Sequence, residues 1–162
     1  MEPVIRRCRD DELAAIGEIV NAAAVAYRGV IPEDRWHEPY MGPAELEGEV
    51  AAGVEFWGDE EEGSLLGVMG IQPVQDVTLI RHAYVAPGMQ GRGIGGALLA
   101  ALDARGSGQL LVGTWAAASW AIRFYERHGF VPVADPAALL RRYWSIPERQ
   151  IETSVVLAKP PL

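Results

Sequence analysis

The segment with the clearest chemical potential is a glycine-rich run, QGRGIGG at 90–96. It follows a strand-like run at 77–85, which Pro87-Gly88 ends, and it precedes apolar residues at helical spacing from Ile94 onward. Where such a run joins a strand to a helix, bare backbone N–H groups converge and the helix N-terminus adds positive partial charge. A pyrophosphate is therefore the expected ligand.

Two common phosphate motifs fit this run poorly. The glycines at 91–96 satisfy G-x-G-x-x-G, but Trp115 and Ala116 stand where a dinucleotide site needs an acidic residue. A nucleotide-hydrolysing P-loop needs Lys and Ser or Thr after its last glycine, whereas Ala97 and Leu98 follow here. Both an NAD site and nucleotide hydrolysis are disfavoured.

Read as Gln90-x-x-Gly93-x-Gly95 after Tyr84-Val85-Ala86-Pro87, the same run resembles the coenzyme A pyrophosphate motif of the GNAT superfamily of N-acyltransferases. A second element, Ala121 with Phe124-Tyr125 and Gly129-Phe130, resembles that family's other signature. The order of the two elements and the 35 residues from Gln90 to Tyr125 also fit. One departure is Ala118, where the family often has Asn; Ser119 beside it could substitute or simply cap a helix.

The resemblance implies an α/β (α+β) fold with a mixed, mostly antiparallel central sheet of six to seven strands and helices on both faces. The strands at 77–85 and 109–115 would splay apart, and the pantetheine of acetyl-CoA would lie between them. Backbone groups at 83–85 would bind the pantetheine and thioester, and amides at 91–96 the pyrophosphate. The implied cofactor-binding residues are Ala83, Tyr84, Val85, Gln90, Gly91, Arg92, Gly93, Ile94, Gly95 and Gly96.

Acyl transfer to an amine needs a base and is helped by an acid. An amine with a pKa of ~10.4 is charged at neutral pH and must lose a proton, and the thiolate leaves more readily if a group donates to it. By motif position Tyr125 is the predicted acid, and the Val85 N–H is a candidate oxyanion donor.

The base is left open by the sequence. His82 is the first candidate because it lies on the strand entering the glycine run, although a lone strand histidine is more often a hydrogen-bonded sheet residue. Glu33, His37 and Glu55 are weaker candidates, and a water relayed to a carboxylate would serve equally well.

An acceptor site is expected from aromatic residues and from the loop after the first helix. The predicted acceptor-binding residues are Tyr27, Glu33, Trp36 and Trp115. Most tryptophans should be core, and one of Trp115 and Trp120 is expected to face the acceptor, which would suit a flat or hydrophobic amine.

Secondary structure that could position these groups follows from periodicity and turn residues. Strands are expected at 4–7, 54–57, 65–71, 77–85, 109–115, 130–133 and 151–157. Helices are expected after an N-cap at Asp10, at 43–52, from Ile94 and at 120–128, the last one closed by Gly129. The acidic run 59–63 is expected to form a solvated hairpin turn, and residues 1–162 a single acyltransferase domain.

Composition narrows the possible partners. A formal charge of -8 repels polyanions, so nucleic acid is not an expected partner. The apolar runs are too short for a membrane span and the start lacks a signal-peptide core, so a cytoplasmic protein is expected. Cys8, the single cysteine, is expected to be a buried structural thiol, and no metal site is predicted. The cluster 141–144 could form a homodimer edge or cover the cleft, while a plain surface helix end is the simpler interpretation.

Two functions remain open at this stage. The first is an N-acetyltransferase acting on a primary amine of a small molecule, with a protein N-terminus or lysine as the variant acceptor. The second is an inactive coenzyme A-binding regulatory module, in which the missing Asn and the unassigned base would reflect lost catalysis.

Overall fold

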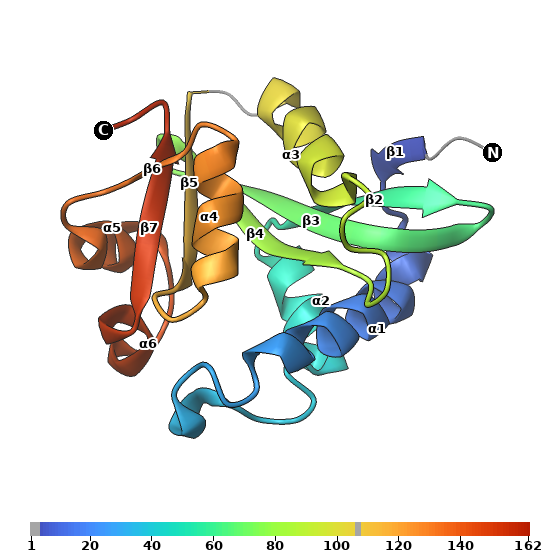
Figure 1. Cartoon of the computed structure of the whole chain (residues 1–162), viewed down its shortest axis with the longest axis horizontal. Helices are drawn as coiled ribbons and strands as arrows, with labels where there is room; N and C mark the ends of the chain where they lie inside the picture. Colours follow the sequence, from blue (N-terminus) through green and yellow to red (C-terminus); the bar gives the residue numbers. More distant parts are fainter. Residues whose placement is uncertain (1–3, 106–107) are drawn as a thin grey trace. The chain divides into compact units, whose positions relative to one another are not determined.

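Seven strands form one sheet in the order β1-β2-β3-β4-β5-β7-β6 in the computed structural model, which describes residues 4–105 and 108–162 (Figure 1). The strands are β1 (Val4–Arg7), β2 (Glu55–Glu61), β3 (Ser64–Val74), β4 (Val77–Val85), β5 (Gln109–Trp115), β6 (Val131–Pro132) and β7 (Ser154–Lys159). The helices are α1 (Leu13–Ala24), α2 (Pro43–Ala51), α3 (Ile94–Arg105), α4 (Ser119–Arg127), α5 (Pro136–Tyr143) and α6 (Glu148–Glu152). The mostly antiparallel sheet of an α/β protein confirms the predicted fold class, while the splay between two central strands stays a prediction.

The described residues form two compact units, and β4 contributes to both. The first unit holds residues 4–26, 37–72 and 80–105, and the second holds 27–36, 73–79 and 108–162. The expected single domain over the whole chain stays a prediction. None of the helices within these ranges has both the length and the apolar character needed to cross a bilayer.

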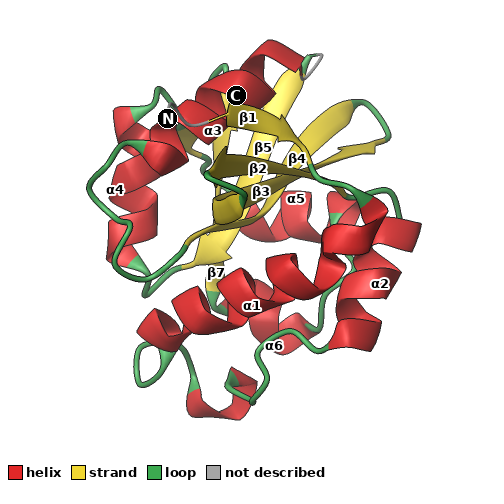
Figure 2. Ribbon diagram, turned by 90° about the vertical axis from the view of Figure 1, so that its right-hand side faces the viewer, coloured by secondary structure: helices red, strands yellow, loops and turns green. Residues whose placement is uncertain are grey.

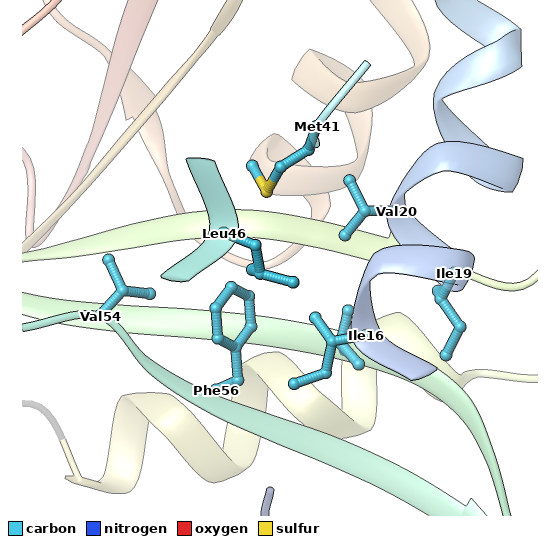
Figure 3. Close-up of a cluster of buried hydrophobic side chains, with 8 residues drawn as sticks. Ile16, Ile19, Val20, Met41, Leu46, Val54 and Phe56 are labelled. Atoms are coloured by element: carbon cyan, nitrogen blue, oxygen red, sulfur yellow. The ribbon is translucent and has the colours of Figure 1, made fainter. Parts of the chain in front are cut away.

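One face of the first unit's strands is covered by α1 and α2 (Figures 1 and 2). Helical spacing brings Ile16, Ile19 and Val20 of α1 to the same side, where they pack with Leu46 of α2 and Phe56 of β2 (Figure 3). Burying each of these side chains contributes roughly 1.5–3 kcal/mol. This cluster fixes α2 to the sheet.

Helix α3 covers the opposite face of these strands, where close approach requires a glycine. A Cβ on Gly67 of β3 would lie 2.8 Å from Ile94 Cγ2 and 3.3 Å from the Tyr84 carbonyl. The first turn of α3 is therefore seated directly on β3. Helices on both faces confirm that part of the prediction for this unit.

The β2–β3 hairpin corrects the predicted acidic turn. Strand β2 continues to Glu61, and the turn is Glu62-Gly63, whose φ values of 52° and 82° suit a tight two-residue connection. Asp59, predicted to be solvated, is only 2% exposed because it pairs within the sheet with Ile5 and Gly67. The run around Asp59 is acidic and shows no alternation of apolar and polar residues, so the sequence pattern did not indicate that β2 continues through it.

In the second unit, α5 and α6 pack on the strands β5 and β7. Leu140 and Tyr143 of α5 and Ile151 of α6 form a core with Leu111 and Val156 of those strands. Helix α4 lies on the other side of β5 and β7 from α5 (Figures 1 and 2). Helices therefore flank both faces here as well.

The predicted start of α1 and the predicted start of the last strand were wrong. Asp10 does not cap α1, because residues 10–12 form a short 3-10 turn whose N-cap is Arg9, and Glu12 Oε1 accepts the Arg9 amide at 2.7 Å. Residues 151 and 152 of the predicted strand 151–157 belong instead to α6, in which Ile151 is the buried residue, and β7 starts at Ser154. Cys8 is half-buried rather than buried, and burial raises the pKa of its thiol to about 11.

Candidate functional site

The glycine turn, defined as residues Gln90–Gly96, connects β4 to α3 within the first unit. Gly91 and Gly93 adopt left-handed φ values of 82° and 78°, and a Cβ on either would meet nothing within 4 Å. The Ala97 amide donates to the Gly93 carbonyl at 3.0 Å, which is the first hydrogen bond of helical type in α3. The backbone amides that precede Ala97 at the start of α3 therefore have no acceptor within the helix. Amides around alternating left-handed residues form a concave anion site.

Side chains of the glycine turn brace it from two sides. Gln90 Oε1 accepts the Gly88 amide at 3.2 Å and its Nε2 donates to the Val85 carbonyl at 3.4 Å. Arg92 Nη2 donates to Glu61 Oε2 of β2 at 2.9 Å. Arg92 is thus held beside the turn by a partner that the sequence did not reveal.

The strand end that precedes this turn carries the predicted pantetheine-binding residues. Ala83, Tyr84 and Val85 are all half-buried at the end of β4. The amide of Ala86 donates to the Leu66 carbonyl at 2.8 Å, which anchors the end of the strand to β3. All ten predicted cofactor-binding residues therefore lie on one continuous strand–turn–helix segment of the first unit.

His82 stands in a distorted part of β4, with a left-handed φ of 54°. Its Nε2 lies 3.4 Å from Glu49 Oε1 of α2, within ion-pair range but outside hydrogen-bond geometry. The ring also stacks on Phe56 with centroids 6.0 Å apart. Glu49 was not predicted as a site residue, although its place three residues after buried Leu46 puts it on the core-facing side of α2.

Tyr125, the predicted acid, lies on α4 in the second unit and is 6% exposed. Its ring makes edge contacts with Phe124 and Phe130 at centroid distances of 5.1 and 5.6 Å. Burial, and to a smaller degree Tyr27, raises the pKa of the phenol well above its usual value. The group therefore carries its proton throughout the neutral range, as an acid must.

Residues 27–36, which follow α1 and hold three of the predicted acceptor-binding residues, also belong to the second unit. Tyr27 stacks on Trp120 at 5.9 Å, and Trp120 is 40% exposed. Asp34 ties the loop to α6 by accepting from Arg149 Nε at 3.1 Å. Of the other predicted acceptor residues, Glu33 is exposed, Trp36 is half-buried and Trp115 is 6% exposed.

The weaker base candidates have other partners. Glu55 accepts from Trp57 Nε1 at 2.9 Å and lies 3.8 Å from Arg7 Nε. His37 is exposed and its Nδ1 lies 2.8 Å from the Pro39 carbonyl oxygen. Ser119 is the first residue of α4, so Ala118 rather than a serine holds the N-cap position.

The predicted site residues thus fall into two groups. His82 and the ten cofactor-binding residues belong to the first unit, whereas Tyr125, Tyr27, Glu33, Trp36 and Trp115 belong to the second. Glu49 and Glu61 are the residues that sequence reasoning missed. Among residues 4–105 and 108–162, no cluster of three His, Cys, Asp or Glu side chains is arranged to hold a metal ion.

Comparison with known proteins gives a match over the same segment. Residues 52–132 match the family model described as the Acetyltransferase (GNAT) domain. No curated protein sequence matches the chain.

Solved structures share the fold at low identity. A GNAT family acetyltransferase from Brucella melitensis, in complex with acetyl-CoA, is 25% identical, with 80% of this chain and 83% of that chain covered and a TM-score of 0.59. The PaiA N-acetyltransferase from Thermoplasma acidophilum, in complex with coenzyme A, is 17% identical, with 98% of each chain covered and a TM-score of 0.74. The ribosomal-protein-S18-alanine N-acetyltransferase from Escherichia coli is 20% identical, with 96% of this chain and 92% of that chain covered and a TM-score of 0.68.

Proposed function

Because the chain belongs to the acetyltransferase (GNAT) domain family, we propose that it transfers the acetyl group of acetyl-CoA to a primary amine of a small molecule. The observation that carries this proposal is the glycine turn. Its left-handed glycines leave open space beside bare amides at the start of α3, which suits the pyrophosphate of coenzyme A. The related acetyltransferases that contain coenzyme A or acetyl-CoA support the same cofactor.

Cofactor binding in this proposal depends mainly on the backbone. Amides from Gly91 to Gly96 hold the pyrophosphate, and main-chain groups of Ala83, Tyr84 and Val85 hold the pantetheine as a neighbouring strand would. Arg92 adds a positive charge at the turn, where Glu61 keeps its guanidinium in place. The bound cofactor supplies the acetyl thioester.

The proposed chemistry is direct attack on that thioester. His82 accepts a proton from the acceptor amine, and the freed nitrogen lone pair forms a bond to the acetyl carbonyl carbon. When the tetrahedral intermediate collapses, the carbon–sulfur bond breaks and Tyr125 donates its proton to the departing thiolate. The nitrogen then loses its remaining extra proton, which returns the tyrosine to the phenol form.

A screen of acceptors tests this function. The chain is incubated with acetyl-CoA and a panel of small primary amines, free lysine and peptides with free N-termini, and both thiol release and product mass are measured. Amine-dependent thiol release with a product heavier by one acetyl group is expected for small amines. Tight coenzyme A binding with no product on any acceptor would contradict the proposal and favour the regulatory module.

The variant acceptor is a protein N-terminus. The structural relative that acetylates the alanine of ribosomal protein S18 makes this the second candidate. Acetylation of the peptides but not of the small amines in the same screen would replace the first candidate with this one.

A further inference from the structure

Two consecutive side chains of β4 reach the same carboxylate, which a regular strand does not allow. Arg81 Nη2 lies 3.3 Å from Glu49 Oε1, and His82 Nε2 lies 3.4 Å from the same oxygen. Successive strand residues normally point to opposite faces of the sheet. The left-handed backbone of His82, at φ 54°, breaks this alternation and turns both side chains toward α2.

That backbone conformation is strained, so the surroundings must hold it. A non-glycine residue in the left-handed region is energetically unfavourable and tends to persist at functional sites. Here the ring of His82 is fixed by Phe56 on one side and Glu49 on another. The three charged or titratable side chains are all largely buried, with exposed fractions of 17% for Arg81, 18% for Glu49 and 14% for His82.

Glu49 is held in place and ionised by more than the histidine. Arg81 Nη1 donates to Gln72 Oε1 at 3.0 Å, and Gln72 Nε2 donates to the Ala52 carbonyl at 3.0 Å just beyond α2. His82 and Arg81 beside it lower the pKa of the Glu49 carboxyl. A fixed carboxylate therefore faces the imidazole at neutral pH.

His82 Nε2 is buried and makes no hydrogen bond within the described part of the chain. A structural histidine usually satisfies its buried nitrogen, because an unpaired polar group in low dielectric is costly. The Glu49 carboxylate is close enough to accept from this nitrogen after a small closure of the 3.4 Å gap.

From this geometry we infer that Glu49 is a positioning residue that orients His82 as the base of the acetyl transfer. The inference rests on the proposed function. The Glu49 carboxylate accepts a hydrogen bond from the Nε2–H group of the ring. The lone pair on Nδ1 is then free to take a proton from the acceptor amine, directly or through a water. The negative charge of Glu49 also stabilises the imidazolium that forms when the proton arrives.

Arg81 has a separate part in this arrangement. Its guanidinium donates to the same Glu49 oxygen at 3.3 Å and, through Gln72, is tied to the end of α2. The charged groups recorded around the base are thus Glu49 on α2 and Arg81 on β4, while Phe56 contributes an apolar face.

Kinetics of Glu49→Gln test the inference, with Glu47→Gln as the matched control. Glu47 is exposed on the same helix, so its variant should behave like the wild type. For Glu49→Gln we expect kcat to fall roughly 10- to 100-fold with an unchanged KM for acetyl-CoA. The pH dependence of its kcat should also differ from that of the wild type, because the base has lost its charged partner. Glu49→Asp, which keeps the charge, should recover part of the lost kcat.

Nitrogen NMR of the imidazole provides a readout that does not depend on activity. The chain has three histidines, so His82→Gln identifies the resonance. The wild type should show the ring proton on Nε2 at pH values above its titration, and Glu49→Ala should lose this preference while Glu47→Gln keeps it. Melting temperature and circular dichroism check that each variant is folded.

Two results would overturn the inference. One is a kcat and pH profile for Glu49→Gln that match those of Glu47→Gln. The other is an unchanged His82 tautomer in Glu49→Ala, which decides the matter even if some variants are unstable. A wild-type chain that acetylates no amine contradicts the proposed function instead, and the NMR comparison still tells whether Glu49 orients His82.

Discussion

The glycine turn of the first unit and helix α4 of the second are proposed to take part in one reaction. The turn would use backbone atoms, and α4 would use a side-chain atom. In the glycine turn, backbone amides are proposed to bind the cofactor, and the side chains of Gln90 and Arg92 already contact Val85 and Glu61. In α4, a single phenol hydroxyl on Tyr125 is the proposed acid. Backbone function tolerates changes of side chain unless they disturb φ, whereas side-chain function depends on one atom.

The two regions are therefore expected to fail differently. Loss of a hydroxyl should impair catalysis without affecting cofactor affinity, and distortion of the turn should impair affinity first. Measuring kcat and the coenzyme A dissociation constant separately for each variant makes the difference visible.

The largest effect is expected for Tyr125→Phe. Removing a general acid lowers kcat by roughly 10²- to 10⁴-fold, and the dissociation constant for coenzyme A should not change. Tyr143→Phe is the control, since it removes a partly buried hydroxyl that donates to Asp76 at 2.8 Å and should affect stability but not kcat. An unchanged kcat for Tyr125→Phe would remove this residue from the mechanism.

A smaller effect, on affinity, is expected for Gly93→Val. A β-branched residue resists the left-handed φ of 78° and would disturb the amides at the start of α3. Coenzyme A affinity measured by calorimetry should fall roughly 10- to 100-fold, in line with a strain of 1–3 kcal/mol. Gly48→Ala in α2, where a Cβ meets nothing within 4 Å, should bind normally. Equal affinity of the Gly93 variant and the wild type would separate the turn from cofactor binding.

A still smaller change is expected for Gln90→Ala. Its side chain bonds to Gly88 and Val85 at 3.2 and 3.4 Å, but the amides proposed to bind phosphate remain. We expect affinity to fall by less than about 10-fold, as one or two weak hydrogen bonds are lost. A loss as large as that of Gly93→Val would mean that Gln90 contacts the cofactor itself.

The two units are also expected to differ in how much an ion pair contributes to the free energy of unfolding. In the first unit, Arg6 donates to both oxygens of Glu12 at 2.8 Å and lowers the pKa of that carboxyl to about 2. Because the folded pKa is depressed, this stabilisation is present above the unfolded pKa of about 4.5 and is lost as pH falls through about 2. Glu12→Gln should lower the free energy of unfolding by about 1–2 kcal/mol at pH 7 and by much less near pH 2.

The ion pair chosen for comparison in the second unit should contribute almost nothing to the free energy of unfolding. Asp34 and Arg149 are exposed, and such pairs are screened by water and salt. Thermal unfolding of Asp34→Asn should show no measurable change in melting temperature. A pH-independent loss in Glu12→Gln, or a clear loss in Asp34→Asn, would contradict this distinction.

Sequence patterns predicted the segments whose function depends on the backbone. The strand 77–85, the glycine turn and strand 109–115 have the predicted boundaries, because glycine, proline and apolar periodicity directly report local backbone preference. The left-handed Gly129 after α4 was found for the same reason, with φ at 91°. Confirmed family membership follows from this segment.

Contacts between distant side chains could not be predicted in the same way. Glu49 meets His82 only because the strand is distorted at that histidine, and nothing in the local sequence marks a left-handed residue there. Asp59 was assigned to a solvated turn because its neighbours are acidic, yet sheet pairing buries it. Both cases depend on tertiary packing, which overrides local pattern.

Titration calorimetry of the unmodified chain with coenzyme A tests the central claim most directly. The account predicts saturable binding of coenzyme A at one site per chain, binding weakened roughly 10- to 100-fold in Gly93→Val, and no comparable affinity for NAD or ATP. Binding of a nicotinamide dinucleotide or a nucleoside triphosphate in the absence of any affinity for coenzyme A would contradict it.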